Sequence, residues 1–186
     1  VKGSALKSRF QFVEARYGSA GVERLLGALP PEDRDLYAAG ILVSQWYPFE
    51  TFVRVLATID SLFGNGDLSL CIDMARHAAD VNLTTLYRFF YRIGSVNFIL
   101  GMAARLWRAH YDAGELVIHG GERMATLQIV DWPAPERAHC LSVMGLATGI
   151  AAPAAPSSRR SPAALRTRLA RGAVRCAHQE GRRPHR

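Results

Sequence analysis

Long apolar runs are absent from this sequence: no stretch of its 186 residues approaches the 18–20 consecutive apolar residues, roughly, that cross a bilayer. The first residues, Val1-Lys2-Gly3-Ser4, do not show the apolar stretch and cleavage site of a signal peptide. Cysteine is scarce as well, because the chain has only three, Cys71, Cys140 and Cys176. An odd, scattered set argues against a disulfide framework and indicates a reducing compartment. We therefore expect a cytoplasmic protein with no membrane partner.

Recognisable catalytic motifs are also missing. The sequence contains no G-x-S-x-G, no phosphate-binding P-loop and no G-x-G-x-x-G, and its carboxylates are spread along the chain rather than paired. His139 and Cys140 are adjacent, but neighbours on a helix point about 100° apart, whereas a Cys–His nucleophile pair must face one another. We therefore interpret Cys140 as a small buried hydrophobe. The sequence predicts no catalytic residue, and we expect that the protein is not an enzyme.

The positive charge of the chain belongs to its last 36 residues. The net charge is +7, but residues 151–186 hold nine arginines, no lysine and a single acid, Glu180. Residues 1–150 are consequently close to neutral. Nucleic acid is therefore an expected partner only if this arginine-rich tail is native sequence.

Apolar residues recur at helical spacing through the first 112 residues. A first helix begins near Ser4 and stops at Gly18, a second runs to Leu29, and a third short one begins at Pro31. The clearest stripe lies between Phe49 and Phe63 and ends at a Gly-Asn-Gly turn. Asp67 is expected to cap the next helix, and further helical patterns continue to residue 112.

The period changes after residue 114. Residues 115–131 alternate around a pair of glycines and predict a hairpin, and residues 135–150 predict a final amphipathic helix with Cys140, Val143, Met144 and Ala147 on one side. We therefore predict one α+β domain, residues 1–150, that is predominantly helical. Its helical part, 4–112, precedes a small antiparallel sheet with a packed helix.

Residues 151–186 do not resemble this domain. They begin with an Ala-Pro-Ser linker and continue as an arginine-rich segment without an aromatic residue. Three interpretations remain open: an arm that binds nucleic acid or acidic lipid, a disordered end without a partner, or a GC-rich coding sequence translated out of frame. We favour the third, so we expect this tail to be disordered or out of frame.

Aromatic residues gather in three groups along the helical part. Their rings suggest a pocket for a small apolar ligand, with tyrosine hydroxyls and a histidine as orienting groups. The alternative is an aromatic core without a cavity, because aromatics at helical spacing usually serve packing. The residues predicted to bind the ligand are Trp46, Tyr47, Phe49, Tyr87, Phe90, Tyr91, Trp107, His110 and Tyr111.

Histidine offers one route to a metal or heme. His77 and His110 lie on or at the end of predicted helices beside apolar stripes, where either could be a ligand. No H-x-x-x-H, H-E-x-x-H or C-x-x-C motif accompanies them, so we interpret them as ordinary helix histidines. The sequence predicts neither a metal site nor a resident cofactor.

Several separated motifs carry a family resemblance. They are Lys2-Gly3-Ser4-Ala5-Leu6, Ala28-Leu29-Pro30-Pro31-Glu32-Asp33-Arg34, Trp46-Tyr47-Pro48-Phe49-Glu50, Asn82-Leu83-Thr84 and Arg137-Ala138-His139-Cys140-Leu141-Ser142-Val143. Together, over about residues 1–146, they resemble a paralogous family of unknown function known mainly from myxobacteria. More distantly, the chain is similar to heme–nitric-oxide-binding-like and 4-vinyl-reductase-type sensor domains. That similarity implies a small ligand held between a helical part and an α/β part.

The tail departs from the pattern of those sensor domains. They often close with C-x-x-x-G-x-x-x-C, where this chain has Arg168, Gly172 and Cys176, and their heme-binding members carry a Tyr-x-Ser-x-Arg signature that is absent here. The aromatic groups and this distant similarity together favour a non-enzymatic sensory or regulatory domain that binds a small apolar ligand. The alternatives are a helical protein–protein interaction or dimerisation module, acting as a homodimer, and a heme or metal sensor.

Overall fold

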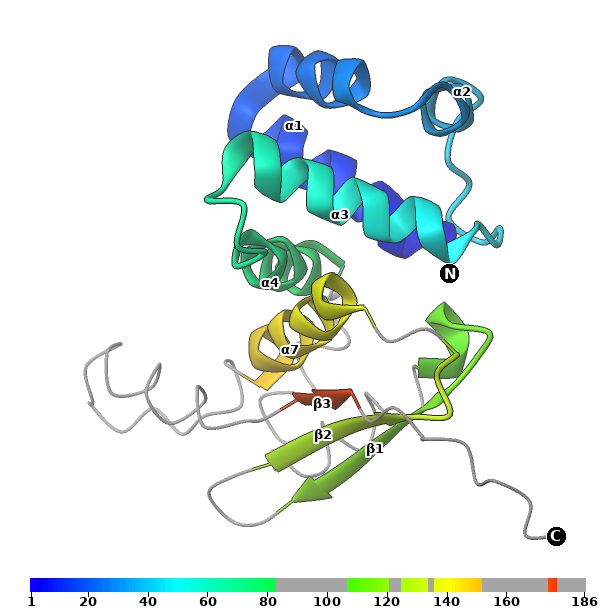
Figure 1. The fold of residues 1–186 in the computed structure, drawn as a ribbon, viewed down its shortest axis with the longest axis vertical. Helices are drawn as coiled ribbons and strands as arrows, with labels where there is room; N and C mark the ends of the chain where they lie inside the picture. Colours follow the sequence, from blue (N-terminus) through cyan, green and yellow to red (C-terminus); the bar gives the residue numbers. More distant parts are fainter. Residues whose placement is uncertain (83–106, 121–124, 134–135, 152–173, 177–186) are drawn as a thin grey trace, which may run out of the picture.

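The computed structural model describes residues 1–82, 107–120, 125–133, 136–151 and 174–176. Within them, helices α1 to α4 precede a strand pair, a further helix and a short last strand. Figure 1 shows α1 and α3 on one side of the molecule, α4 and α7 in the middle and the sheet on the far side of α7. The predicted α+β class, predominantly helical, is confirmed.

The first helices follow the predicted signals closely. Helix α1 (Gly3–Ala28) kinks at Gly18, where φ is 68°. Only glycine adopts this backbone at little cost, which is why the sequence predicted a helix end there. Helix α2 (Pro31–Ala38) begins at a proline and carries Glu32 and Asp33 in its first turn.

Helix α3 (Phe49–Phe63) lies across α1 and carries the predicted apolar stripe. Phe52, Leu56 and Ile59 are completely buried, whereas Phe49 and Phe63 pack at the edge of the core. Helix α4 (Leu70–Asn82) follows after a tight turn. The backbone N–H groups of Leu68 and Leu70 donate to the buried Asp60 carboxylate at 2.8 and 3.0 Å.

Asp67 has a smaller part in this turn than the sequence predicted. Its carboxylate accepts the N–H of Ser69 at 2.9 Å, outside the helix, and it is exposed. Asp60, which lies near the end of the preceding helix, accepts the N–H of the first α4 residue instead. A side chain of α3, Asp60, therefore fixes the position at which α4 begins.

Strands β1 (Glu115–Gly120) and β2 (Ala125–Val130) form the predicted antiparallel hairpin, with Glu115 opposite Val130. Helix α7 (Arg137–Ala151) follows, and strand β3 (Val174–Cys176) then pairs with β2 in parallel. The sheet order is β1-β2-β3. The tail was predicted to be disordered or out of frame, and three of its residues form a strand of this sheet. The rest of the tail lies outside the described residues.

Helices α4 and α7 pack unusually closely, and glycine permits it. A Cβ placed on Gly145 would lie 2.3 Å from the carbonyl oxygen of Ile72, and one on Gly149 would lie 3.0 Å from the Cβ of Ala79. The buried face of α7 differs from the predicted one. Its buried residues are Ala138, His139, Ser142, Val143, Gly145, Ala147 and Gly149, whereas the predicted Cys140 and Met144 are half-buried.

The cysteines differ from expectation in one respect. Cys71 is a free, buried thiol, but Cys140 is disulfide-bonded. The interpretation of Cys140 as a simple buried hydrophobe is therefore wrong. In the part of the chain that the structure describes, no helix has the length and apolar character needed to cross a membrane.

Candidate ligand site

The centre of the candidate site is His139, on the first turn of α7. Its side chain is 1% exposed and lies against aromatic rings from three parts of the chain. The ring centroids closest to the imidazole are those of Tyr111 (4.8 Å), Phe49 (5.0 Å), Trp132 (5.0 Å), Trp107 (5.7 Å) and Phe52 (6.4 Å). We call these five rings the aromatic cage.

The cage is assembled from segments that are distant in sequence. Phe49 and Phe52 lie on one face of α3, three residues apart, whereas Trp132 is the second residue after the end of β2. The ring centroids of Trp107 and Tyr111 lie 4.3 Å apart with the rings tilted by 30°, and the Trp107 indole N–H donates to the carbonyls of Ala113 and Gly114, both at 3.0 Å. The N–H of that ring is thus satisfied while the ring also packs against the imidazole.

His139 itself has no such partner. Both Nδ1 and Nε2 are buried, and neither forms a hydrogen bond with the residues that the structure describes. Burial, followed by the positive charges of Arg9 and the chain's amino terminus, lowers its pKa to about 3. The imidazole is therefore neutral at pH 7, with one N–H donor and one acceptor nitrogen. Leaving a buried polar atom unpaired costs about 1–3 kcal/mol, so the site retains unmet hydrogen-bonding capacity.

Arg9, on α1, is the second unusual group. It is 4% exposed, and its guanidinium carbon lies 5.4 Å from the centroid of the Phe52 ring. Its Nη1 donates to the carbonyl of Met74 at 3.1 Å and more weakly to Ser8 at 3.4 Å. Its Nη2 donates to the Ser142 hydroxyl at 2.9 Å, but Nε has no partner. Burial lowers the pKa of Arg9 to about 10, so it stays charged at pH 7.

Ser142 connects these two groups. It lies three residues after His139 on α7, so both side chains share one face of that helix. Since Arg9 donates to Ser142 and contacts Phe52, which also faces His139, the guanidinium lies beside the aromatic cage. The site thus combines a buried cation, a neutral imidazole and five aromatic rings.

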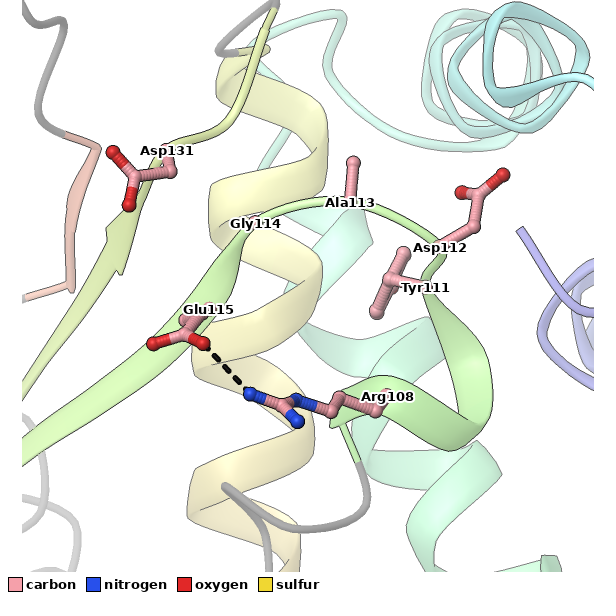
Figure 2. A pocket seen from close by; sticks show the side chains of 7 residues that line it. All are labelled: Arg108, Tyr111, Asp112, Ala113, Gly114, Glu115 and Asp131. Atoms are coloured by element: carbon pink, nitrogen blue, oxygen red, sulfur yellow. Dashed lines mark hydrogen bonds and ion pairs between the residues drawn. The ribbon is translucent and has the colours of Figure 1, made fainter.

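A surface pocket of about 460 Å³ adjoins the cage. Figure 2 shows its lining, which includes Tyr111 and the ion pair of Arg108 with Glu115, 2.8 Å apart. Asp112 and Asp131 also line it. Tyr111 belongs to both the pocket lining and the cage.

Eight of the nine predicted ligand-binding residues, all except His110, fall into three groups. Phe49, Trp107 and Tyr111 meet in the cage. Trp46 and Tyr47 lie elsewhere, in the α2–α3 connection: the Trp46 ring is 41% exposed under the Lys2 ammonium, and the Tyr47 hydroxyl accepts the N–H of Leu42. Three predicted residues, Tyr87, Phe90 and Tyr91, lie outside the described residues.

Neither histidine considered as a metal ligand lies in the cage. The imidazole of His77 packs edge-on to Phe12 at 5.5 Å, and the main-chain carbonyl of His110 accepts the N–H of Lys2 at 2.8 Å. Among the described residues, no three side chains of His, Cys, Asp or Glu gather closely enough to hold a metal ion.

Sequence reasoning missed Arg9, Phe52, Trp132 and His139 as site residues. A signal existed for two of them. Arg9 falls three residues after Leu6 and four before Val13, so it is a charge within the predicted apolar stripe of α1. His139 likewise precedes Val143 by four residues on the buried side of α7. A polar residue within a predicted apolar stripe thus indicates a buried polar site.

Comparison with known proteins adds no relative. No protein-family model, no curated protein and no solved structure matches this chain. The resemblance to the myxobacterial family and to sensor domains therefore stays a prediction.

Proposed function

We propose that this chain is a non-enzymatic sensory or regulatory domain that binds a small, mainly apolar ligand in the aromatic cage. One observation carries the proposal: His139 lies buried among five rings with both ring nitrogens unpaired. Small-molecule sites are typically apolar and aromatic cavities with a few polar groups that fix the orientation of the ligand. The cage has that chemistry.

Stability alone does not favour a histidine at this position. A leucine of similar volume would fill the core without an unpaired donor and acceptor, and so would avoid their desolvation cost. The cost is offset when a ligand supplies the missing hydrogen bonds.

The protonation state of His139 also favours binding over catalysis. A general base works best with a pKa near the operating pH, whereas the pKa of His139 is about 3. The nearest free thiol does not supply a nucleophile, because burial raises the pKa of Cys71 to about 12. Among the described residues, the pKa values of His139 and Cys71 therefore favour a binding role over a catalytic one.

We also propose that the protein is located in the cytoplasm. The disulfide at Cys140 weighs against it, because disulfides are rare in reducing compartments. Fractionation of the producing cell, with detection of the native chain, decides this point without affecting the ligand.

The experiment uses the full chain. Native mass spectrometry of the purified protein reveals any molecule that copurifies, and thermal unfolding is then measured with toluene, benzyl alcohol and indole. We expect at least one probe to raise the Tm and to change the tryptophan fluorescence, because Trp107 and Trp132 line the cage.

The variant His139→Phe should abolish the probe's effect, because its larger ring fills the cage. His77→Phe is the matched control, since His77 also lies on a helix and packs on an aromatic ring, but outside the cage. If no probe changes the Tm or the fluorescence and no bound mass is found, the proposal is wrong.

A further inference from the structure

We infer that the ligand is a carboxylate with an apolar body, whose anionic group pairs with Arg9 and accepts a second hydrogen bond from His139. This inference rests on the proposed function, and it specifies the chemical class of the ligand. Its basis lies within the described part of the chain, where the buried Arg9 has no anionic partner and the neighbouring His139 has no hydrogen-bond partner.

The first step concerns the charge of Arg9. Removing an ionised group from water is costly, and buried charges are normally paired with an opposite charge. The described salt bridges involve Arg54, Arg76 and Arg108, and among the residues that the structure describes none pairs with Arg9. Of the chain's 16 acidic residues, all but Glu122 and Glu180 lie among the described residues.

The second step concerns the donors. The partners of Arg9 on Nη1 and Nη2 are a carbonyl and hydroxyls, which are neutral. They fix the plane of the guanidinium and leave the Nε–H without an acceptor. A guanidinium presents its N–H groups as a rigid fork that matches the two oxygens of a carboxylate. The remaining donor thus prefers an anionic oxygen.

The third step concerns the imidazole. Since His139 is neutral, it can donate one hydrogen bond to an oxygen that already accepts from Arg9. The His139 ring packs against aromatic rings, so a group that binds beside it also contacts apolar surface. An anionic group on a hydrocarbon or aromatic body would accept hydrogen bonds from Arg9 and His139 and also pack against the rings. A small inorganic anion would only accept the hydrogen bonds.

The acidic groups of the neighbouring pocket act against rapid binding. Asp112 and Asp131 line it, and Arg108 neutralises only Glu115. A free anion approaching from this side is repelled, and we expect association to be faster at 0.5 M salt than at 0.05 M, because salt screens exposed charges. The buried pair of donors is screened much less.

The experiment compares acids with their neutral amides. Thermal unfolding of the full chain is measured in benzoate against benzamide and in hexanoate against hexanamide, at pH 7 and with sodium chloride added to equal ionic strength. Above its Kd, a ligand raises the Tm by about 3–5 °C for each tenfold increase in concentration for a chain of this size. We expect that slope for at least one acid and little or none for its amide.

Two variants test the role of the guanidinium. Arg9→Met keeps much of the side-chain length without the charge, and should abolish the preference for the acid. Arg16→Met is the matched control, because Arg16 lies on the same helix and near an aromatic ring, Phe12, but is exposed. The control should keep the preference of the unmodified chain.

The outcomes separate the two proposals. If an amide stabilises as well as its acid, or if Arg9→Met keeps the preference, the carboxylate inference is wrong and the proposed function stands. If neither the acids, the amides nor the apolar probes stabilise the protein, both are wrong. Should Arg9→Met fail to fold, the acid and amide pairs on the unmodified chain still decide, because they require no variant.

Discussion

Replacing Asp60 by alanine should destabilise the protein far more than a single surface carboxylate would. The side chain is completely buried and accepts two main-chain hydrogen bonds at the start of α4, from Leu68 and Leu70. It lies near the C-terminal end of α3, where a negative charge is unfavourable to that helix. Its contribution therefore lies in the following turn and in α4.

The magnitude follows from the two donors. Each N–H left without its acceptor costs about 1–3 kcal/mol, so Asp60→Ala should lower the free energy of unfolding by about 3 kcal/mol. In a chain of this size that corresponds to a fall of about 6–12 °C in Tm. The effect should extend to the ligand site, because α4 supplies the Met74 carbonyl that holds Arg9.

Urea unfolding followed by circular dichroism measures this loss, with Asp67→Ala as the matched control. Asp67 is exposed and accepts one hydrogen bond from Ser69 in the same turn. We expect a clearly smaller loss for Asp67→Ala. Equal losses for the two variants, or a loss below about 1 kcal/mol for Asp60→Ala, would refute the reasoning that Asp60 fixes the start of α4.

Three further predictions concern packing and pH. Gly145→Ala should destabilise the protein by about 1–3 kcal/mol, because the new Cβ meets the backbone of Ile72, whereas Gly27→Ala, with open space around it on a helix, should be neutral or stabilising in the same urea assay. Lowering the pH from 6.5 towards 4 should reduce the free energy of unfolding by about 1.4 kcal/mol per pH unit through His139, because the unfolded chain binds a proton that the buried imidazole beside Arg9 does not. The variant His139→Phe should remove that slope. An unchanged slope in the variant contradicts the burial of a neutral imidazole. Burial opposes ionisation of Asp33, but its hydrogen bonds and the adjacent arginine hold its pKa below the usual range, so its contribution is present above about pH 4 and lost as the pH falls further; Asp33→Asn should flatten that acid limb of a pH–stability curve.

The helical part was predictable because its signals are local. The stripe of α3 repeats at the period of a helix, Gly18 has a backbone conformation that few other residues accept, and Pro31 occupies a first helical position, where its missing N–H is not needed. The hairpin was predictable for the same reason, since residues 115–131 alternate around glycines. Each of these features depends on neighbours within a few positions.

The site was only partly predictable, because it is made by contacts between distant segments. Trp107 and Tyr111 are one helical turn apart, and the sequence grouped them correctly. Nothing local places Trp132 or His139 beside them, or brings Arg9 within reach of Ser142, 133 positions later. Aromatic density was a weaker guide than polarity within an apolar stripe, since Trp46 is aromatic but exposed, whereas Arg9 and His139 are polar but buried.

Strand β3 was not predictable from propensity. Its three residues, Val174, Arg175 and Cys176, lie in an arginine-rich segment with no alternation to indicate a strand. Pairing with β2 determines it, not its own composition.

The parallel pairing of β2 and β3 also orders the events of biosynthesis. Parallel neighbours need a long connection, and here α7 and the residues after it separate the two strands, so a ribosome adding about 5–20 residues per second completes β3 seconds after β2. During that interval the helices and the hairpin can already assemble, while the edge of β2 that pairs with β3 has no neighbouring strand. Such an edge can pair with another chain, so the newly made protein is more exposed to aggregation before β3 has been added than after it.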